Sequence, residues 1–356
     1  MGTGLLSFSP AALCSRIPGL SPKQKKLCVE SPDAVVALGS GHVLGSKECQ
    51  YQFNGHRWNC SEVWKKDIFG HVISVGSKEA AFTYAIANAG IVYAIAASCS
   101  RGNISICGCD QVHRHKNAYQ DQVSFTTCPV TVLIHTLSAD LSFSFSSRFL
   151  FDSQSWKWGG CSVDIDFGIR FARKFLDVRE IEGDARSEMN LHNNQAGRKI
   201  VRKLLKKDCQ CHGISGSCQL KTCWKILPQF REVGDVLYKK WEKAKHIVAQ
   251  KTDTGINLVI KRKGGKEPSK PKISDLVYLQ QSPNYCEKNI LLGSSGTHGR
   301  KCNRTPTSSD SCKILCCGRG YATKLFHNTW QCNCKFEWAL MNVKCEICSE
   351  RTEEYF

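Results

Sequence analysis

The chain has 356 residues, of which 42% are hydrophobic and 22% charged, as is typical of a globular protein with a packed core. Its formal charge of +18 indicates an anionic partner. No zinc-finger, RRM or helix-turn-helix pattern accompanies that charge, so we expect no nucleic-acid partner. For an exported chain, the charge predicts binding to sulfated glycosaminoglycan, such as heparan sulfate proteoglycan.

Twenty-two cysteines are untypical of a cytosolic chain, because cytosolic thiols stay reduced. Zinc sites usually combine two cysteine pairs with wider internal spacing, whereas eight cysteines here form four pairs that are adjacent or one residue apart, as Cys209 and Cys211 are. The pattern favours disulfides and an extracellular location, and we expect no metal site. Three N-glycosylation sequons, at Asn59, Asn103 and Asn303, agree with export. Asn103 is the best of them, because each of the other two adjoins a cysteine.

The N-terminal third contains one clear helix and one unusual insertion. Residues 1–13 have no basic residue and only a broken apolar run, so we expect an atypical N-terminus without a clear signal peptide. Residues 77–99 predict a buried helix with Ser77 as N-cap and apolar side chains almost all round. Residues 111–155 contain Pro129 and many hydroxyls, which predicts a weakly structured insertion rather than a membrane helix.

Apolar residues at helical spacing predict three further helices, over 162–177, 184–207 and 229–247. The second of these ends in a basic run, Arg202-Lys203 and Lys206-Lys207. Cations are favourable at a helix C-terminus, and the same cations could form a heparan-sulfate-binding strip; both interpretations can hold at once.

The composition changes after residue 250. Residues 251–272 are rich in Gly, Pro and Lys, which predicts an exposed basic linker. Nine cysteines then fall between Cys286 and Cys348. We therefore expect a helical domain over 14–250 and a small cystine-rich β domain over 273–356.

The segment 209–224 reads CQCHGISGSCQLKTCW. Gly213 and Gly216 permit a tight turn at little steric cost. If the inner cysteines pair with each other and the outer two likewise, the segment is a doubly stapled hairpin that presents Ser215 at its tip. An exposed hydroxyl in that position suits covalent modification.

Ser215 and His212 could instead be a nucleophile and its base. The flanking residues lack the strand-to-helix elbow of a serine hydrolase, and no carboxylate lies nearby in sequence to orient His212. We therefore expect no catalytic residue and no enzyme activity. A secreted serine lipid hydrolase is the less favoured alternative.

These motifs resemble the Wnt family of secreted, lipid-modified signalling glycoproteins. The resemblance extends over most of the chain, outside the first thirteen residues and about 111–155. It rests on CHGISGSC with KTCW, CQYQFNGHRWNC at 49–60, KEAAFTYAI at 78–86, WKWGGCS at 156–162, MNLHNNQAGRK at 189–199, SDLVYLQQSPNYCE at 274–287, CCGRGY at 316–321 and WQCNCKFEW at 330–338. RIPGL, FARKFLDVREI and LPQFREVG are most similar to the seventh Wnt subfamily.

The resemblance implies a Wnt fold: a mainly α N-terminal domain with a disulfide-stapled hairpin, and a small cystine-rich β-hairpin C-terminal domain. It implies that Ser215 carries a covalent palmitoleate, and that this lipid and the N-linked glycan are the only added groups. It implies no cofactor. That lipid and Ile214 would enter the cysteine-rich domain of a Frizzled receptor. Phe336, Trp338, Leu340 and Met341, at the tip of a C-terminal finger, would supply the second receptor contact.

The resemblance also implies a low-density-lipoprotein-receptor-related co-receptor, an acyl-binding carrier in the secretory route, and location in the extracellular space and matrix. The implied disulfides are Cys49–Cys60, Cys99–Cys107, Cys109–Cys161, Cys209–Cys223, Cys211–Cys218, Cys286–Cys317, Cys302–Cys312, Cys332–Cys348 and Cys334–Cys345, with Cys14–Cys28 as a tenth.

Two cysteines depart from the family pattern. Cys128 lies in the insertion, and Cys316 has no partner near the end of this sequence. The finger tip has Ala339-Leu340 where members usually carry two cysteines, so we expect a tip without a local staple. A receptor-binding but signalling-defective antagonist is therefore a further alternative.

Overall fold

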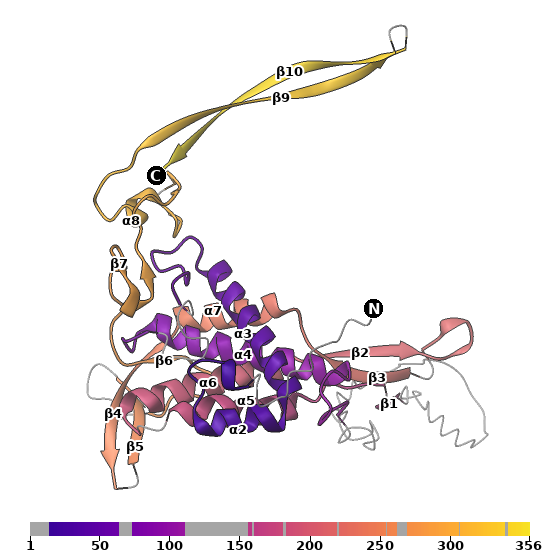
Figure 1. Ribbon diagram of the computed structural model, residues 1–356, viewed down its shortest axis with the longest axis vertical. Coiled ribbons are helices and arrows are strands. Elements are labelled where there is room, and N and C mark those ends of the chain that lie inside the picture. Colours follow the sequence, from indigo (N-terminus) through magenta and orange to yellow (C-terminus); the bar gives the residue numbers. More distant parts are fainter. Residues whose placement is uncertain are drawn as a thin grey trace, which may run out of the picture.

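The computed structural model describes residues 14–63, 73–110, 156–158, 160–180, 183–218, 221–253, 255–261, 269–305, 307–338 and 341–356, the backbone alone for 156–158. A bundle of helices forms the body of the molecule (Figure 1). One hairpin projects from each end of the bundle, and a long two-stranded ribbon extends away from it (Figure 1). The expected insertion over 111–155, including Cys128, and the N-terminal residues 1–13 lie outside the described residues.

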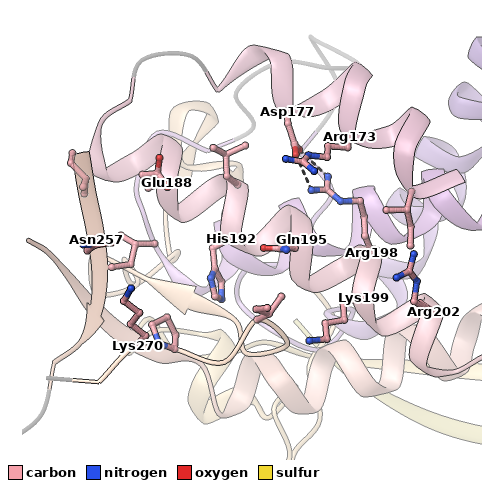
Figure 2. Close-up of a pocket in the computed structure, with 16 residues that line it drawn as sticks. Arg173, Asp177, Glu188, His192, Gln195, Arg198, Lys199, Arg202, Asn257 and Lys270 are labelled. Carbon is pink, nitrogen blue, oxygen red and sulfur yellow. Dashed lines mark hydrogen bonds and ion pairs between the residues drawn. The ribbon is translucent and has the colours of Figure 1, made fainter. Parts of the chain in front are cut away.

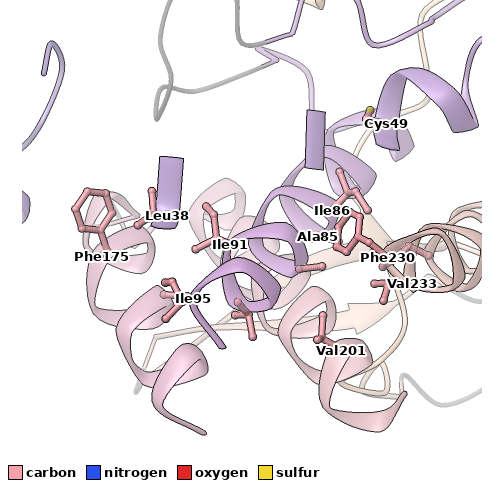
Figure 3. Packing of buried hydrophobic residues seen from close by; sticks show 14 of the residues in the cluster. Leu38, Cys49, Ala85, Ile86, Ile91, Ile95, Phe175, Val201, Phe230 and Val233 are labelled. Carbon is pink, nitrogen blue, oxygen red and sulfur yellow. The ribbon is translucent and has the colours of Figure 1, made fainter. Parts of the chain in front are cut away.

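Helix α4 is the centre of the bundle and packs against four other helices, α3, α5, α6 and α7. Phe82, Ile86, Ile91 and Ile95 of α4 are completely buried (Figure 3 shows part of this core). The helices are α2 (Pro22–Glu30), α3 (Pro32–Gln52), α4 (Lys78–Ser100), α5 (Ile165–Leu176), α6 (Ala185–Lys203), α7 (Phe230–Glu242) and α8 (Cys312–Leu315), with 3-10 turns η2 (Asp177–Arg179), η3 (Ile214–Gly216) and η4 (Ile290–Leu292).

Helix α4 confirms the helix predicted over 77–99, and the Ser77 side chain accepts a hydrogen bond from the Ala80 backbone as its N-cap. By length and composition α4 could cross a membrane, but 72% of its apolar window is buried inside the protein, as in a core helix. It is the only such helix among the described residues.

Helices α3 and α4 approach so closely that their backbones touch. A Cβ atom added to Gly41 would lie 2.5 Å from the Gly90 carbonyl oxygen, and one added to Gly90 would lie 2.3 Å from the Gly41 carbonyl oxygen. Neither position leaves room for a side chain. The two glycines therefore set the distance between the two longest helices.

The strands form four small sheets, with strand orders β1-β3-β2, β5-β4-β6, β7-β8 and β10-β9. All pairs are antiparallel except β1–β3 and β4–β6, which are parallel. The strands are β1 (Trp156–Trp158), β2 (Lys206–Cys211), β3 (Lys221–Ile226), β4 (Lys245–Thr252), β5 (Gly255–Ile260), β6 (Val277–Tyr278), β7 (Lys288–Asn289), β8 (Ser294–Ser295), β9 (Thr323–Glu337) and β10 (Asn342–Tyr355).

Two predicted helices extend too far at their C-terminal ends. The helix predicted over 184–207 ends at Lys203, because residues 206–211 pair with β3 as strand β2. The helix predicted over 229–247 ends at Glu242, because residues 245–252 pair with β5 and β6 as strand β4. In both cases pairing with a following strand overrides the local helical pattern.

The helix predicted from Ser162 begins three residues later, at Ile165, with Asp164 as its N-cap. Ser162 instead accepts a hydrogen bond from the backbone of Lys225, beside strand β3. Strand β5 lies inside the predicted linker 251–272, so the first part of that segment is ordered sheet. The division into domains at residue 273 stays a prediction, and Leu276 packs into the main helical core.

Ten disulfides join cysteines that the structure describes, and they are the nine pairs that the resemblance implies together with Cys14–Cys28. Among the described cysteines Cys316 alone is free. Its sulfur lies 4.0 Å from that of Cys302. Cys302 and Cys312 are joined to each other, so this group of three sulfurs offers a single thiol rather than a metal site.

Candidate functional site

The hairpin of β2 and β3 is held closed by two disulfides at successive levels. Cys209 and Cys223 are directly opposite in the strand register, with Cα atoms 4.1 Å apart. Cys211 and Cys218 close the loop beyond the last strand pair, with Cα atoms 4.6 Å apart. The Cys211–Cys218 disulfide therefore closes the loop into a short covalent ring, and the Cys209–Cys223 disulfide holds together the two strands that carry it.

Ser215 lies at the tip of this loop in the left-handed backbone region, with φ 57° and ψ 27°. Gly213 donates a backbone hydrogen bond to the Ser217 carbonyl at 2.8 Å, which closes the turn around Ser215. A Cβ atom on Gly213 would lie 2.4 Å from the Ser217 carbonyl oxygen, so the turn requires glycine there. A non-glycine residue at positive φ carries strain, and such residues concentrate at functional sites.

The environment of Ser215 is open. Ser215 is exposed, and its neighbour Ile214 is 92% exposed, which makes Ile214 the most exposed large apolar residue described. An isoleucine fully in water at a loop tip contributes nothing to the fold. The tip thus offers a hydroxyl beside an apolar side chain, a combination that suits a lipid attachment point and a contact surface.

His212 does not activate Ser215. Its Nε2 atom lies 3.0 Å from the Thr222 hydroxyl, across the hairpin. Ser215 has no hydrogen-bond partner among the residues that the structure describes, and no carboxylate accepts from the His212 ring in the same set. The geometry of a nucleophile, base and orienting acid is therefore missing from the described residues of the hairpin.

The base of the hairpin is fixed to the body of the protein. Strand β1 pairs with β3 in parallel, from Trp156 opposite Lys221 to Trp158 opposite Cys223. The Cys109–Cys161 disulfide then joins the chain just after β1 to the segment after α4. A fixed base and a covalently closed tip present Ser215 in one position relative to the bundle (Figure 1).

The ribbon of β9 and β10 is the second exposed feature. Cys332–Cys348 and Cys334–Cys345 staple it near its far end. At the tip Trp338 is 80% exposed and Met341 is 74% exposed. Phe336 stacks edge-to-face on Trp338, with ring centroids 4.8 Å apart. These three residues lie at the tip, as predicted; Leu340, predicted with them, lies outside the described residues.

The three sequon asparagines differ in accessibility. Asn103 and Asn303 are exposed, whereas Asn59 is half-buried. The Asn59 side-chain oxygen accepts hydrogen bonds from Ser61 and, at 3.2 Å, from the Ser295 hydroxyl. Glycan attachment is therefore sterically easiest at Asn103 and Asn303, and attachment itself stays a prediction.

The basic strip predicted at 202–207 is partly neutralised. Arg202 forms an ion pair with Asp166, and Lys206 forms one with Glu232 at 2.6 Å. A denser group of lysines, not predicted from the sequence, is assembled by the fold from 239–245 and 270–272 around one hollow. The repeated lysines within YKKWEKAKH and KPK were the available signal.

A second hollow of about 650 Å³ lies between α5, α6 and β5 (Figure 2). A buried ion pair crosses its wall, where Arg198 donates to both carboxylate oxygens of Asp177 at 2.8 Å. Burial lowers the pKa of His192 in the same wall, and its Nε2 atom lies 2.9 Å from the Asp275 carbonyl oxygen. No described residue of the β2–β3 hairpin lines this hollow, which belongs to a different part of the surface.

Comparison with known proteins agrees with this architecture. The family model described as the Wnt family matches residues 16–356. Protein Wnt-2 of Drosophila melanogaster is 51% identical over 357 residues, which cover 98% of this chain and 93% of that protein. A chain in the solved structure of human WLS in complex with WNT8A matches with a TM-score of 0.55 and 32% identity, over 90% of this chain and 92% of that one.

The match to this structure confirms the predicted Wnt fold, with its helical N-terminal region and cystine-rich C-terminal hairpin. Nothing in the comparisons favours a lipid hydrolase or an antagonist, and assignment to the seventh subfamily stays a prediction. Members of the family are signalling ligands and not enzymes, which agrees with the missing catalytic geometry at Ser215. On the strength of the family model and the 51% identity, this chain belongs to the Wnt family as a disulfide-rich signalling ligand of developmental pathways.

Proposed function

We propose that the Ser215 hydroxyl is the acceptor of a palmitoleoyl chain, and that this lipid carries the binding of the protein to a Frizzled cysteine-rich domain. The observation that supports it most is the exposed, partner-free hydroxyl at the tip of a doubly stapled hairpin. Burial of an acyl chain contributes about 0.8 kcal/mol for each CH2 group, so one chain can supply much of a binding free energy.

The loop geometry supports this role in a second way. Because the two staples already fix the loop, little conformational entropy is lost when an acyltransferase or a receptor binds it. Ile214, next to the acceptor, would extend the apolar contact in the receptor groove.

The tip of the β9–β10 ribbon is the proposed second contact with the same receptor. Trp338 and Met341 expose large apolar side chains directly after β9 and before β10, at the end of a ribbon that extends far from the helical body (Figure 1). Exposed aromatic anchors at the end of a rigid element are typical of binding hot spots. Leu340 is included in this contact on the family resemblance alone.

Further partners follow from the family membership and are proposals for this chain. A chain that carries an acyl group needs a carrier in the secretory route, and WNT8A is in complex with WLS in the matched structure. We also propose secretion to the extracellular space and matrix, N-glycans at Asn103 and Asn303, binding to heparan sulfate proteoglycan, and a low-density-lipoprotein-receptor-related co-receptor.

The test compares Ser215→Ala with Ser217→Ala, a hydroxyl deletion two residues away in the same loop. Both variants are expressed with an epitope tag beside wild-type, and Frizzled-dependent reporter activity is measured per amount of protein. The proposal expects loss of at least about 90% of the activity for Ser215→Ala and little loss for Ser217→Ala. Equal activity of Ser215→Ala and wild-type would contradict it.

A further inference from the structure

Six lysines gather around one hollow of about 670 Å³ at the end of the bundle from which β4 and β5 project. They come from three places in the sequence: α7, the start of β4, and the segment before β6. Their neighbours in the wall include Val236, Ile260 and Asp275. The six are Lys239, Lys240, Lys243, Lys245, Lys270 and Lys272.

The backbone holds these three segments together. Lys245 donates its amide to the Leu276 carbonyl at 2.8 Å, which joins the start of β4 to the segment before β6. The Ile260 amide donates to the Ser269 carbonyl at 2.9 Å, which brings the 269–272 segment alongside β5. The lysines therefore converge because of the fold, and not through chance rotamers of a flexible tail.

The charge in this hollow is largely uncompensated. Among the described residues that line it, Asp275 is the one carboxylate, and it accepts from Lys240 at 2.9 Å. The other five lysines are exposed and form no ion pair with a described residue. Like charges held this close oppose folding, so a surface of this kind points to an anionic ligand.

The cationic surface continues into the second hollow. Lys270 lines both, and Arg173 and Lys199 line the second together with Arg202, which is paired with Asp166 (Figure 2). The carboxylates of Asp177 and Glu188 also line the second hollow, and Asp177 is paired with Arg198. Together the two hollows form a path that a linear polymer with repeated negative charges could follow, whereas a single small anion would use only part of it.

We propose that the lysine hollow is the binding site for the sulfated glycosaminoglycan that the proposed function invokes, and the inference rests on that function. Lysine dominates the hollow, and its ammonium groups act as flexible point charges rather than planar, bidentate forks. Recognition therefore follows charge density more than a fixed sulfation pattern. A concave wall also fits a chain in a groove better than a flat bilayer surface.

The position of the hollow has a functional consequence. Strands β4 and β5, which supply Lys245 and Ile260 to its lining, project from the opposite end of the bundle from the β2–β3 hairpin and away from the far end of the β9–β10 ribbon (Figure 1). Glycosaminoglycan in this site leaves Ser215 and Trp338 uncovered. The protein can therefore be held in the matrix and still present both proposed receptor contacts.

The test measures the affinity of the full-length secreted protein for immobilised heparin. The site variant is Lys243→Ala, Lys245→Ala and Lys272→Ala, with one exposed lysine from each segment. The control is Lys25→Ala, Lys313→Ala and Lys335→Ala, which removes the same charge from exposed positions in α2, α8 and β9. We expect the site variant to bind at least about tenfold more weakly than the control and to show a smaller dependence on salt.

Three other results would each overturn the proposed site. Equal weakening of the two variants would mean that overall charge alone binds heparin, and would overturn the site. Unchanged heparin binding with lost binding to phosphatidylserine vesicles would identify a membrane surface instead, and would also overturn it. No heparin binding by wild-type protein would reject the polyanion partner itself, while the Ser215 proposal would be judged separately by its own reporter test.

Discussion

Tyr285 donates a hydrogen bond of 2.9 Å to the buried carboxylate of Glu79, across 206 residues of sequence. Glu79 is in the first turn of α4, and Tyr285 precedes the Cys286–Cys317 disulfide. Burial raises the pKa of the Tyr285 hydroxyl well above its usual range, so the phenol stays protonated and remains a donor. This bond fastens the C-terminal region to the central helix of the bundle.

Replacement of Tyr285 by Phe should destabilise the protein by about 1.5–3 kcal/mol, because Glu79 would keep its buried position and lose its donor. Thermal unfolding of the purified protein measures the effect. Tyr321→Phe is the control, since Tyr321 is 47% exposed. A melting temperature equal to wild-type for Tyr285→Phe would show that water replaces the lost donor.

The close contact of α3 with α4 can be tested by substituting two neighbouring glycines of α3. Gly41→Ala should abolish secretion of folded protein, because the new methyl group would lie 2.5 Å from backbone atoms of Gly90 and Ile91. Gly39→Ala changes the same helix two residues earlier, where nothing lies within 4 Å. That variant should be secreted normally and be more stable by about 0.5–1 kcal/mol. Comparable secretion of the two variants would contradict the close helix contact.

Buried histidines make the stability depend on pH. Burial lowers the pKa of His42 from 6.5 to about 4, and it also lowers the pKa values of His56 and His192. Between about pH 4 and pH 6.5, His42 binds a proton in the unfolded chain but not in the folded chain. The stability from His42 is therefore complete above about pH 6.5 and falls as the pH drops toward 4, by at most about 3 kcal/mol.

The variant His42→Gln should show a flatter decrease of unfolding free energy between pH 6.5 and pH 4 than wild-type does. Chemical denaturation at four or five pH values in this window measures the slope. His298→Gln changes an exposed histidine and should keep the wild-type slope. The same slope in His42→Gln as in wild-type would contradict the assignment.

The ribbon tip should contribute to receptor affinity separately from the acyl loop. Trp338→Ala should weaken binding to a Frizzled cysteine-rich domain by at least about 2 kcal/mol, or roughly 30-fold, as for an aromatic hot spot. Ile347→Ala is matched in exposure, at 80%, but lies in the ribbon away from the tip. Surface plasmon resonance with acylated protein compares the two, and equal affinities would remove the tip from the interface.

The sequence predicted the features that depend on local chemistry. The Ser77 cap and the apolar surface of residues 78–100 identified α4, and the cysteine spacing with the family resemblance identified the hairpin around Ser215. Both features are confirmed because their determinants are contained within short segments.

The features that the sequence missed depend on pairing between strands, which helical periodicity does not report. The helix predicted over 229–247 extends into strand β4, where Ile247 is buried in a sheet and packs with Met189 and Val277. The lysine hollow was missed for the same reason, since β4 and the 269–272 segment meet only after β4 pairs with β5 and β6. Local periodicity carries no information on such contacts.

The central claim is that Ser215 carries an acyl chain, and mass spectrometry of the secreted protein tests it most directly. A protease digest should yield a peptide that spans Ser215, joined through Cys211–Cys218 to its own loop. The account predicts that most of this peptide carries the mass of one monounsaturated C16 acyl group, located at Ser215 by fragmentation. An unmodified Ser215 in secreted, signalling-competent protein would contradict it.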